Sequence, residues 1–238
     1  MSPIHLLLIQ IRQPGSPAET QEQICIRSKL GSRSIQMRTR NALANPATPS
    51  WLDGVEALII GGSGSYSVHH PLSQRCVEPM RKLLDATIAQ TLPCFGICFG
   101  HQLLGLHMGA RVETVETLAE FGTVEVSTTP EGQIDPVFET RKSRWSVHTG
   151  HTDTVTQIPA GVTLLARNDQ VESQAFRVDG LPFYTTQFHP DLSATEALER
   201  YKEIMETKDK NGVPPYETGR DESNDLLGRF IDCHVRRP

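Results

Sequence analysis

Residues 96–104 read Gly96-Ile97-Cys98-Phe99-Gly100-His101-Gln102-Leu103-Leu104 and follow the apolar run from Leu92 to Phe95. This pattern predicts a strand, a sharp turn at Cys98 and then a helix. Glycines at 96 and 100 allow a strained strand-to-helix turn without a Cβ clash, as in nucleophile elbows. The turn places the sulfur at a helix N-terminus, where unpaired N–H groups favour a thiolate. Cys98 is therefore a candidate nucleophile.

The run Tyr184-Thr185-Thr186-Gln187-Phe188-His189-Pro190-Asp191 predicts a strand that ends at a histidine. Pro190 ends the strand and stiffens the turn, so His189 should lie at the strand's carboxyl end. An imidazole there can take the proton of a thiol, and a carboxylate two residues later can orient the imidazole. Cys98, His189 and Asp191 thus fit the roles of nucleophile, base and orienting acid in a triad.

A glycine-rich segment, Gly61-Gly62-Ser63-Gly64, follows the apolar strand Ala57 to Ile60. Taken alone, such a segment is also consistent with a simple turn or a phosphate-binding nest. Together with the elbow, it can present backbone N–H groups to a developing oxyanion because no side chain stands in the way. We predict that the N–H of Gly62 is one oxyanion donor and that the N–H of Phe99 is the second.

Strand and helix signals alternate along the chain. We expect strands at Ile4 to Gln10, Ala57 to Ile60, Pro93 to Ile97, Thr123 to Thr129, Arg144 to Val147, Val162 to Ala166, Ser173 to Val178 and Phe183 to Phe188. We expect helices from Ser16-Pro17, with Glu19, to Gly31, along the face formed by Val77, Met80, Leu83, Leu84 and Ile88, and from Ser193, which with Glu196 forms a capping box. The order predicts an α/β fold, a single-domain, mostly parallel sheet flanked by helices, with the site at the carboxyl ends of the strands.

Four segments in this order resemble the class I glutamine amidotransferases. The elbow and the Gln187-to-Asp191 segment are similar to the parts of that family that carry its Cys-His-Glu triad. Leu58 to Ser65 resembles the family's strand and oxyanion loop. Gly150-His151-Thr152-Asp153-Thr154-Val155 resembles the Ser-His-x-Asp-x-Val segment of GMP-synthase-type glutaminase domains. The resemblance spans roughly residues 4–205 and implies a flavodoxin-like fold.

The resemblance implies hydrolysis of the glutamine side-chain amide through a γ-glutamyl thioester on Cys98. It also implies that Gly64, Gln102, Gly150 and His151 line the pocket for the amino-acid head group of glutamine or of another γ-glutamyl compound. No cofactor is expected. In the family, ammonia passes to a synthetase domain or subunit, and this chain shows no synthetase segment. A separate synthetase subunit is therefore the implied partner.

Two positions depart from the family pattern. Asp191 stands where the family has glutamate, and its side chain is one methylene shorter. The imidazole must therefore lie closer to the turn or be held less firmly. Ser63 stands where the family has a loop proline, which adds an N–H donor and removes rigidity. Neither substitution removes a catalytic group.

The remaining histidines and cysteines have simpler explanations. His101 lies on the helix of the nucleophile and is poorly placed to move a proton between thiol and leaving group. His69, His70, His148 and His151 lack a metal-ligand spacing, so no metal site is expected. The other cysteines are expected to be small buried hydrophobic residues: Cys25, Cys76, Cys94 and Cys233.

Composition agrees with an intracellular enzyme. The 238 residues are 37% hydrophobic and 21% charged, enough to bury a sizeable core. An odd number of cysteines argues against a secreted disulfide framework, so we expect the cytoplasm. The chain carries a formal net charge of −5, its basic residues are dispersed, and it has no membrane-spanning apolar stretch. These features favour neither a nucleic acid nor a membrane as a partner, and they leave the oligomeric state open.

The chain is expected to divide into a catalytic domain at residues 1–206, a polar linker or loop at 207–221 and a C-terminal helix at 222–238. An apolar stripe of Leu226, Leu227, Phe230 and Ile231 marks that helix. Packing on the domain is favoured over a role as a partner-docking arm.

Two further functions remain open from the sequence. A γ-glutamyl peptide hydrolase would use the same triad and thioester but release a larger amine. A non-catalytic regulatory relative would share the fold, although an intact Cys98, His189 and Asp191 argue against it.

Overall fold

The computed structural model describes residues 2–64, 66–139, 142–207, 216–223 and 225–235, and the side chains of residues 204–207 are left out of the description. The greater part of the predicted linker, residues 208–215, therefore lies outside the described residues. So do Ser65 of the glycine loop and the C-terminal residues 236–238. The division into a domain at 1–206, a linker and a terminal helix stays a prediction.

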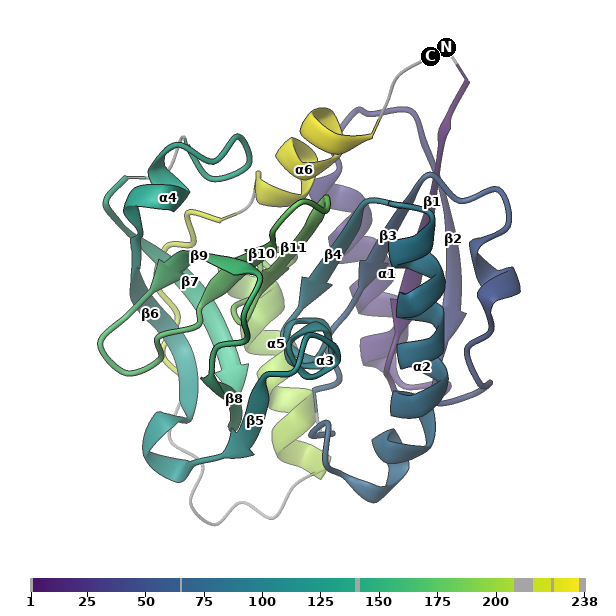
Figure 1. Ribbon diagram of the computed structural model, residues 1–238. Helices are drawn as coiled ribbons and strands as arrows, with labels where there is room; N and C mark the ends of the chain where they lie inside the picture. Colours follow the sequence, from purple (N-terminus) through teal and green to yellow (C-terminus); the bar gives the residue numbers. More distant parts are fainter. Residues whose placement is uncertain (1, 65, 140–141, 208–215, 224, 236–238) are drawn as a thin grey trace.

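A nine-stranded mixed sheet forms the centre of the fold (Figure 1). Its strands, in sheet order, are β2 (Ile35–Asn41), β1 (Ile4–Gln10), β3 (Ala57–Ile60), β4 (Cys94–Ile97), β11 (Phe183–Thr186), β10 (Ala175–Val178), β9 (Val162–Arg167), β6 (Glu120–Thr128) and β7 (Arg144–His151). The first five strands run parallel, and β10, β9, β6 and β7 pair antiparallel. The parallel half has the 2-1-3-4-5 order of flavodoxin-like folds. The α/β prediction is confirmed.

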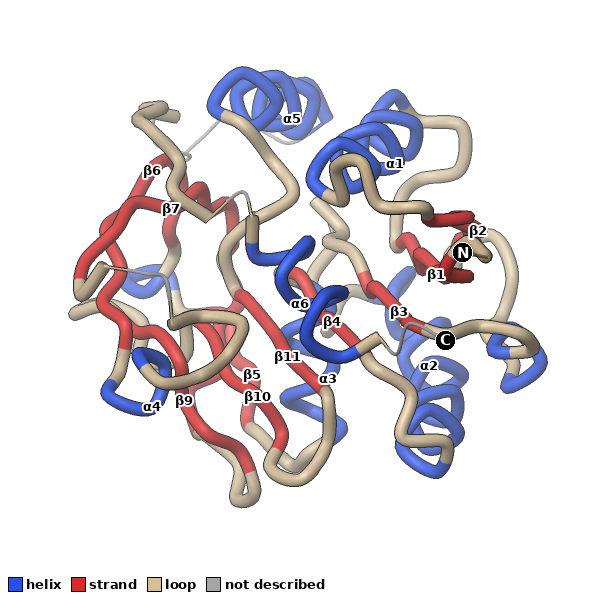
Figure 2. Tube along the Cα trace, turned by 90° about the horizontal axis from the view of Figure 1, so that it is seen from above, coloured by secondary structure: helices blue, strands red, loops and turns tan. Residues whose placement is uncertain are grey.

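Helices cover both faces of the parallel half. They are α1 (Pro17–Lys29), α2 (Pro71–Ala89), α3 (Phe99–His107), α5 (Ala194–Thr207) and α6 (Leu226–His234), with a short α4 (Pro130–Gln133) beside the antiparallel half. Figures 1 and 2 show α1 and α5 on one face of the sheet and α2 and α3 on the other. Alternation along the strands explains the two layers, since successive side chains point to opposite faces.

The two faces of β1 bury different cores. Leu6 and Leu8 join the cluster that contains Ile26 of α1, whereas Leu7 and Ile9 join the cluster that contains Met80 of α2. The predicted apolar face of α2 is confirmed because its members belong to or pack against this second cluster: Val77, Met80, Leu83, Leu84 and Ile88. A four-residue β3 with all its side chains buried is thereby held between two helical layers.

Helix α5 begins with the predicted capping box. Ser193 N donates to Glu196 Oε2 at 2.7 Å, and Glu196 N donates to Ser193 Oγ at 3.4 Å, so both groups stabilise the first turn. Two members of the apolar stripe predicted for this helix, Ile204 and Met205, lie outside the described side chains.

Helix α6 packs its apolar stripe into the first core cluster. Its buried residues are Leu226, Leu227, Gly228, Phe230 and Ile231. The Phe230 ring contacts Phe95 of β4 and Tyr184 of β11, with ring centroids 5.3 and 5.9 Å apart. The C-terminal helix thus covers the same sheet face as α1.

The first helix differs from the expectation at its start. The Ser16 side chain makes no capping bond, and Glu19 Oε2 accepts from Gly15 N at 2.8 Å. Glu19 also accepts from Asn41 Nδ2 through its other oxygen, at 2.7 Å, which draws the carboxylate away from Ser16. The closing Gly31 is as predicted, with a φ of +64° that glycine adopts without strain.

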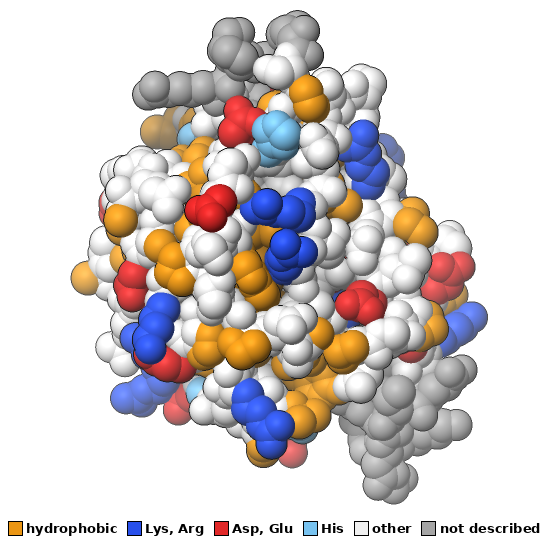
Figure 3. Space-filling model, turned by 90° about the vertical axis from the view of Figure 1, so that its right-hand side faces the viewer, with side chains coloured by type: hydrophobic (Ala, Val, Ile, Leu, Met, Phe, Trp, Pro, Cys, Tyr) orange, Lys and Arg blue, Asp and Glu red, His pale blue; other side chains and the backbone are white. Residues whose placement is uncertain are grey.

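Three short strands were absent from the sequence prediction. Strand β2 is a polar edge strand, and β5 (Arg111–Thr114) and β8 (Asp153–Gln157) form a separate antiparallel pair. Their side chains are largely polar, so hydrophobic periodicity did not reveal them. Figure 3 views the molecule from the side of β2, where basic, acidic and apolar side chains are interspersed.

The structure contains no candidate membrane span in its described part: none of the helices there is both long enough and apolar enough to cross a bilayer.

Candidate active site

Cys98 lies on the sharp turn that the sequence predicts between β4 and α3. Its backbone has φ 51° and ψ −96°, a strained conformation for a residue with a side chain. The turn is held by the N–H of Cys98, which donates to Thr186 O at 2.8 Å, and by its carbonyl, which accepts from Gln102 N at 3.1 Å. The strained turn places the thiol at the carboxyl edge of β4 and at the N-terminus of α3.

The flanking glycines permit this turn because their neighbours approach very closely. A Cβ on Gly96 would lie 2.6 Å from the carbonyl group of Gly100, and a Cβ on Gly100 would lie 2.4 Å from Ile60 O. Both distances are shorter than any ordinary Cβ contact. Helix α3 can therefore pack directly on β3 and β4 only when both positions are glycine.

His189 lies beside Cys98 and follows β11 by three residues. Its N–H donates to His148 O at 2.8 Å, and its Nδ1 lies 3.0 Å from Asp191 Oδ1. Burial opposes a charged imidazole, but the Asp191 carboxylate and a hydrogen bond with Cys98 outweigh it and raise the pKa of His189 to about 9. The imidazole is thus held between a thiol and a carboxylate.

Asp191 is fully engaged by two partners. Its Oδ1 contacts His189, and its Oδ2 accepts from Arg200 Nη1 at 2.9 Å. Burial favours the neutral carboxyl group, yet the charges of His189 and Arg200 hold the pKa of Asp191 well below its usual range. Arg200 in turn donates through Nε to Gln21 Oε1 at 3.0 Å. The shorter acid is therefore firmly placed by α5 and α1.

Gly62 lies against both reactive side chains. A Cβ at this position would meet His189 Cε1 at 3.0 Å, Arg12 Nη2 at 3.3 Å and Cys98 Cβ at 3.6 Å. The N–H of Phe99 belongs to the first turn of α3, where amides have no partner within the helix. The structure thus brings the two predicted oxyanion donors to the two sides of the Cys98 turn.

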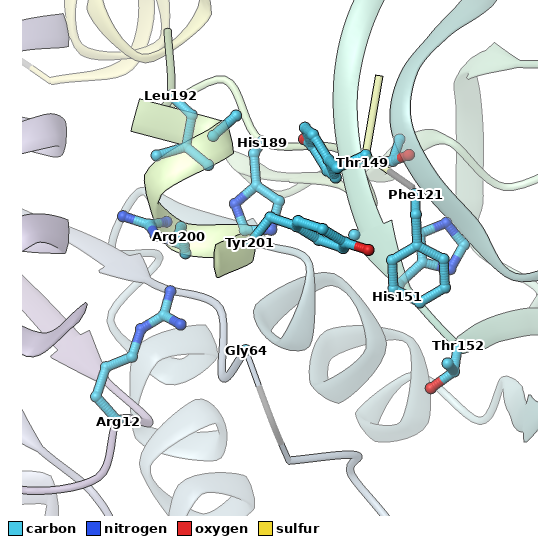
Figure 4. A pocket seen from close by; sticks show the side chains of 13 residues that line it. Arg12, Gly64, Phe121, Thr149, His151, Thr152, His189, Leu192, Arg200 and Tyr201 are labelled. Atoms are coloured by element: carbon cyan, nitrogen blue, oxygen red, sulfur yellow. The ribbon is translucent and has the colours of Figure 1, made fainter. Parts of the chain in front are cut away.

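Three of the four residues expected to bind a head group line one pocket together with His189. These are Gly64, Gly150 and His151 (Figure 4). His151 is held by Glu120 Oε2 at 3.0 Å from its Nε2, and by Asp153 O at 3.0 Å from its Nδ1. The strand β7 extends to His151, four residues beyond the predicted end at Val147, and so carries this wall of the pocket.

Gln102 is not among the described residues that line this pocket. Its Nε2 donates to Asp153 O at 2.9 Å and to Gln187 Oε1 at 3.2 Å. Gln187 Nε2 in turn lies 3.8 Å from Cys98 Sγ, as a donor to the sulfur. The contacts make Gln102 a support for Gln187, and direct binding of a head group by Gln102 stays a prediction.

The other histidines are engaged elsewhere. His101 Nδ1 lies 2.8 Å from Thr185 Oγ1, and burial lowers the pKa of His101 to about 3. His148 Nδ1 lies 3.0 Å from Thr123 Oγ1, and His69 Nε2 lies 2.7 Å from Val112 O. Within the described ranges, no group of three or more His, Cys, Asp or Glu side chains is arranged to hold a metal ion.

The cysteine predictions hold for three positions and fail for one. Cys25, Cys76 and Cys94 are buried, whereas Cys233 is exposed. Cys233 lies on α6, whose apolar stripe at Leu226, Leu227, Phe230 and Ile231 faces the core. Position 233 follows that stripe by two residues and therefore points away from it.

Sequence reasoning missed two buried arginines beside this site. Arg12 follows β1 and pairs through Nη2 with Glu22 Oε1 at 2.7 Å, with side chains 2% and 1% exposed. Arg200, on α5, pairs with Asp191. A glutamate or arginine in a polar sequence stretch carries no local sign of burial, so only the tertiary structure reveals these pairs.

Comparison with known proteins places the chain among amidotransferases. A sequence model described as glutamine amidotransferase class-I matches residues 20–204. A curated subunit of the glutamine-hydrolyzing GMP synthase of Thermococcus kodakarensis is 37% identical over 105 residues, which are 44% of this chain and 54% of that relative. The protein of the same name from Sulfurisphaera tokodaii is 33% identical over 149 residues, 62% of this chain and 74% of that relative.

The chain thus spans about half the length of the first relative and about three quarters of the second. A solved structure of a glutamine amidotransferase from Thermotoga maritima superposes with a TM-score of 0.74 at 19% identity, covering 100% of both chains. That likeness shows the fold.

Proposed function

Because this chain belongs to the class I glutamine amidotransferase family, we propose that it hydrolyses the side-chain amide of glutamine at the site formed by Cys98, His189 and Asp191. The products are glutamate and ammonia. The observation that carries the proposal is the strained turn at Cys98, whose thiol hydrogen-bonds the one imidazole that Asp191 holds. This is the arrangement that acyl transfer to a cysteine needs.

The first half of the reaction forms a thioester. Cys98 Sγ attacks the amide carbon while His189 holds the thiol proton, and the N–H groups of Gly62 and Phe99 stabilise the oxyanion. His189 then donates that proton to the departing nitrogen, and the carbon–nitrogen bond breaks. Ammonia leaves, and the γ-glutamyl group remains on the sulfur.

The second half restores the enzyme. His189 takes a proton from a water molecule, whose oxygen attacks the thioester carbon. Collapse of the tetrahedral intermediate breaks the carbon–sulfur bond and releases glutamate. The net reaction consumes one glutamine and one water and yields one glutamate and one ammonia.

The electrostatics of the site support these roles. A raised pKa keeps His189 protonated and stabilises the thiolate of Cys98 beside it. Gln187 Nε2 adds a donor 3.8 Å from the sulfur. Asp191 stays ionised because Arg200 neutralises it from the other side.

We further propose that a separate synthetase subunit consumes the ammonia and that the protein acts in the cytoplasm. The relatives are named as one subunit of a glutamine-hydrolyzing GMP synthase, and these names support a partner of this kind. The free cysteines of the chain support a reducing compartment, where a thiol nucleophile persists.

The proposal is tested by covalent labelling combined with turnover. An electrophilic glutamine analogue should modify Cys98 and leave Cys94 unmodified, four residues earlier and fully buried in β4. The purified chain should release equal amounts of glutamate and ammonia from glutamine, and Cys98→Ala should release neither. Labelling of Cys94 in preference to Cys98, or turnover by Cys98→Ala, would remove Cys98 from the mechanism.

A further inference from the structure

The pocket that contains His189 extends well beyond the residues expected to hold a glutamyl head group. On the other side of the imidazole it is lined by Arg12, Leu192, Ala197, Arg200, Tyr201 and Tyr216. Figure 4 shows Arg12 and Arg200 on one side of His189 and His151 and Thr152 on the other, with Tyr201 reaching toward Phe121. Ammonia occupies only the space of one nitrogen, so this part of the pocket has room for a substituent on the leaving nitrogen.

The position of His189 decides which part of the substrate enters this space. Its Nδ1 is bound to Asp191, so Nε2 must protonate the leaving nitrogen. Arg12 Nη2 and His189 Cε1, the ring carbon bonded to Nε2, lie within 3.3 Å of the same point above Gly62. A group attached to the leaving nitrogen would therefore project toward Arg12.

Arg12 has unused capacity to bind an anion. The residue is 2% exposed, and within the described part of the chain its side chain is paired through Nη2 alone, with Glu22. Its buried Nε has no hydrogen-bond partner there. A buried guanidinium N–H without an acceptor is unfavourable, and a carboxylate is the group whose geometry fits such a fork.

The rest of the lining agrees with an anionic ligand. Arg200 is 3% exposed and also has a partnerless nitrogen, Nη2, although its other donors hold Asp191 and Gln21. Among the described residues that line this pocket, two are arginines and none is Asp or Glu. The charges of the lining therefore favour a carboxylate over an amine.

The pocket also has an apolar side. Leu192, Ala197 and the tyrosines 201 and 216 line it, and the two tyrosine rings have centroids 4.7 Å apart. Such a surface fits the carbon atoms next to a carboxylate, as in an amino acid.

We propose that this site also hydrolyses γ-glutamyl amides whose nitrogen bears a carboxylate, that is, γ-glutamyl amino acids, and that Arg12 binds this carboxylate. The inference rests on the proposed thioester chemistry at Cys98. One γ-glutamyl amino acid and one water yield glutamate and a free amino acid, which takes from His189 the proton that ammonia takes when glutamine is the substrate.

Three substrates test the inference on the wild-type chain: glutamine, γ-glutamylglycine and γ-glutamylglycinamide, in which the carboxylate is replaced by a neutral amide. Glutamate release should give a kcat/KM for γ-glutamylglycine about tenfold or more above that for the glycinamide, as expected for a charge-assisted bond. Arg12→Met should reduce this ratio to about one.

Two variants keep the test interpretable, because Arg12→Met leaves the buried Glu22 without its cation. Arg12→Met combined with Glu22→Met removes both charges, and the ratio should again be about one. Glu22→Gln keeps the guanidinium, and the preference for γ-glutamylglycine should persist.

The possible failures can be separated. Absence of turnover with all three substrates would refute the proposed function itself. Turnover of glutamine alone, or equal turnover of γ-glutamylglycine and its amide, would overturn the inference and leave the proposed function intact. An equal decrease for all three substrates in the double variant would show that Arg12 binds the glutamyl α-carboxylate, and this too would overturn the inference.

Discussion

Arg200 Nη1 donates to Asp191 Oδ2 at 2.9 Å, and both side chains are almost completely buried. The carboxylate that orients His189 is therefore itself held by a cation from the following helix. Burial of an ion pair stabilises a fold only while both partners remain, because a lone buried charge is strongly unfavourable. Position 191 thus links the proposed chemistry to the stability of the fold.

Asp191→Asn should slow glutamine turnover about a hundredfold or more and lower the free energy of unfolding by about 3 kcal/mol, because His189 loses its acceptor and Arg200 its counter-charge. Ser193→Ala is the matched control: loss of the α5 cap should lower the free energy of unfolding by about 1 kcal/mol and leave kcat unchanged. Both quantities are measured by steady-state kinetics and urea unfolding. An unchanged kcat in Asp191→Asn would leave a Cys98–His189 dyad.

His189→Ala and His101→Ala should have opposite consequences. The first should reduce kcat by about a hundredfold or more, since it removes the proton carrier beside Cys98. The second should reduce the free energy of unfolding by about 1–3 kcal/mol with little change in kcat, because it leaves the buried hydroxyls of Thr185 and Ser173 without the imidazole. A larger loss of kcat in His101→Ala would assign the base to His101.

The backbone at Cys98 predicts an unusual order of stability. Cys98→Gly should be more stable than Cys98→Ala by about 1 kcal/mol or more, because glycine adopts φ 51° without the strain of a Cβ. Neither variant should hydrolyse glutamine. Thermal unfolding checks the order, and a less stable glycine variant would show that the turn stores no backbone strain.

Gly100→Ala should unfold at lower urea concentration than the wild type, by an amount equivalent to about 1–3 kcal/mol, because the new Cβ would meet Ile60 O at 2.4 Å. Gly150→Ala is the control, since no atom lies within 4 Å of its Cβ position. Its stability should change by no more than about 0.5 kcal/mol, while KM for glutamine rises. Equal stability of the two variants would contradict the close packing of α3 on β3.

The histidine pKa values predict how the stability depends on pH. The folded pKa of His189 is raised to about 9 from an unfolded value near 6.5, so its contribution is complete below about pH 6.5 and is lost as the pH rises through about 9. The folded pKa of His101 is lowered to about 3, so stability also falls as the pH drops below about 6.5. Urea unfolding between pH 5 and 9.5 should therefore show a maximum near pH 6.5, and His189→Ala should flatten its alkaline side. An unchanged alkaline side in that variant would refute the prediction.

The sequence alone was sufficient for the α/β class, the elbow and the chemical identity of the reacting groups. Glycines at 96 and 100, and Pro190 after His189, are local requirements of backbone geometry, and such requirements are visible in a single stretch of residues. The same holds for the Ser193–Glu196 capping box, whose partners are three residues apart.

Only the tertiary structure decided what surrounds those groups. The edge strand β2 is polar, so its place in the sheet follows from pairing with β1 and not from its own pattern. Arg12 is separated from Gly62, and Gln187 from Cys98, by long stretches of chain that folding brings into contact. Burial of a charged side chain depends on such distant partners, because an ion pair is stable in the interior only where both ions and their hydrogen bonds meet. The reacting atoms are therefore evident in the sequence, whereas the arginines that line the pocket become evident only when the chain is folded.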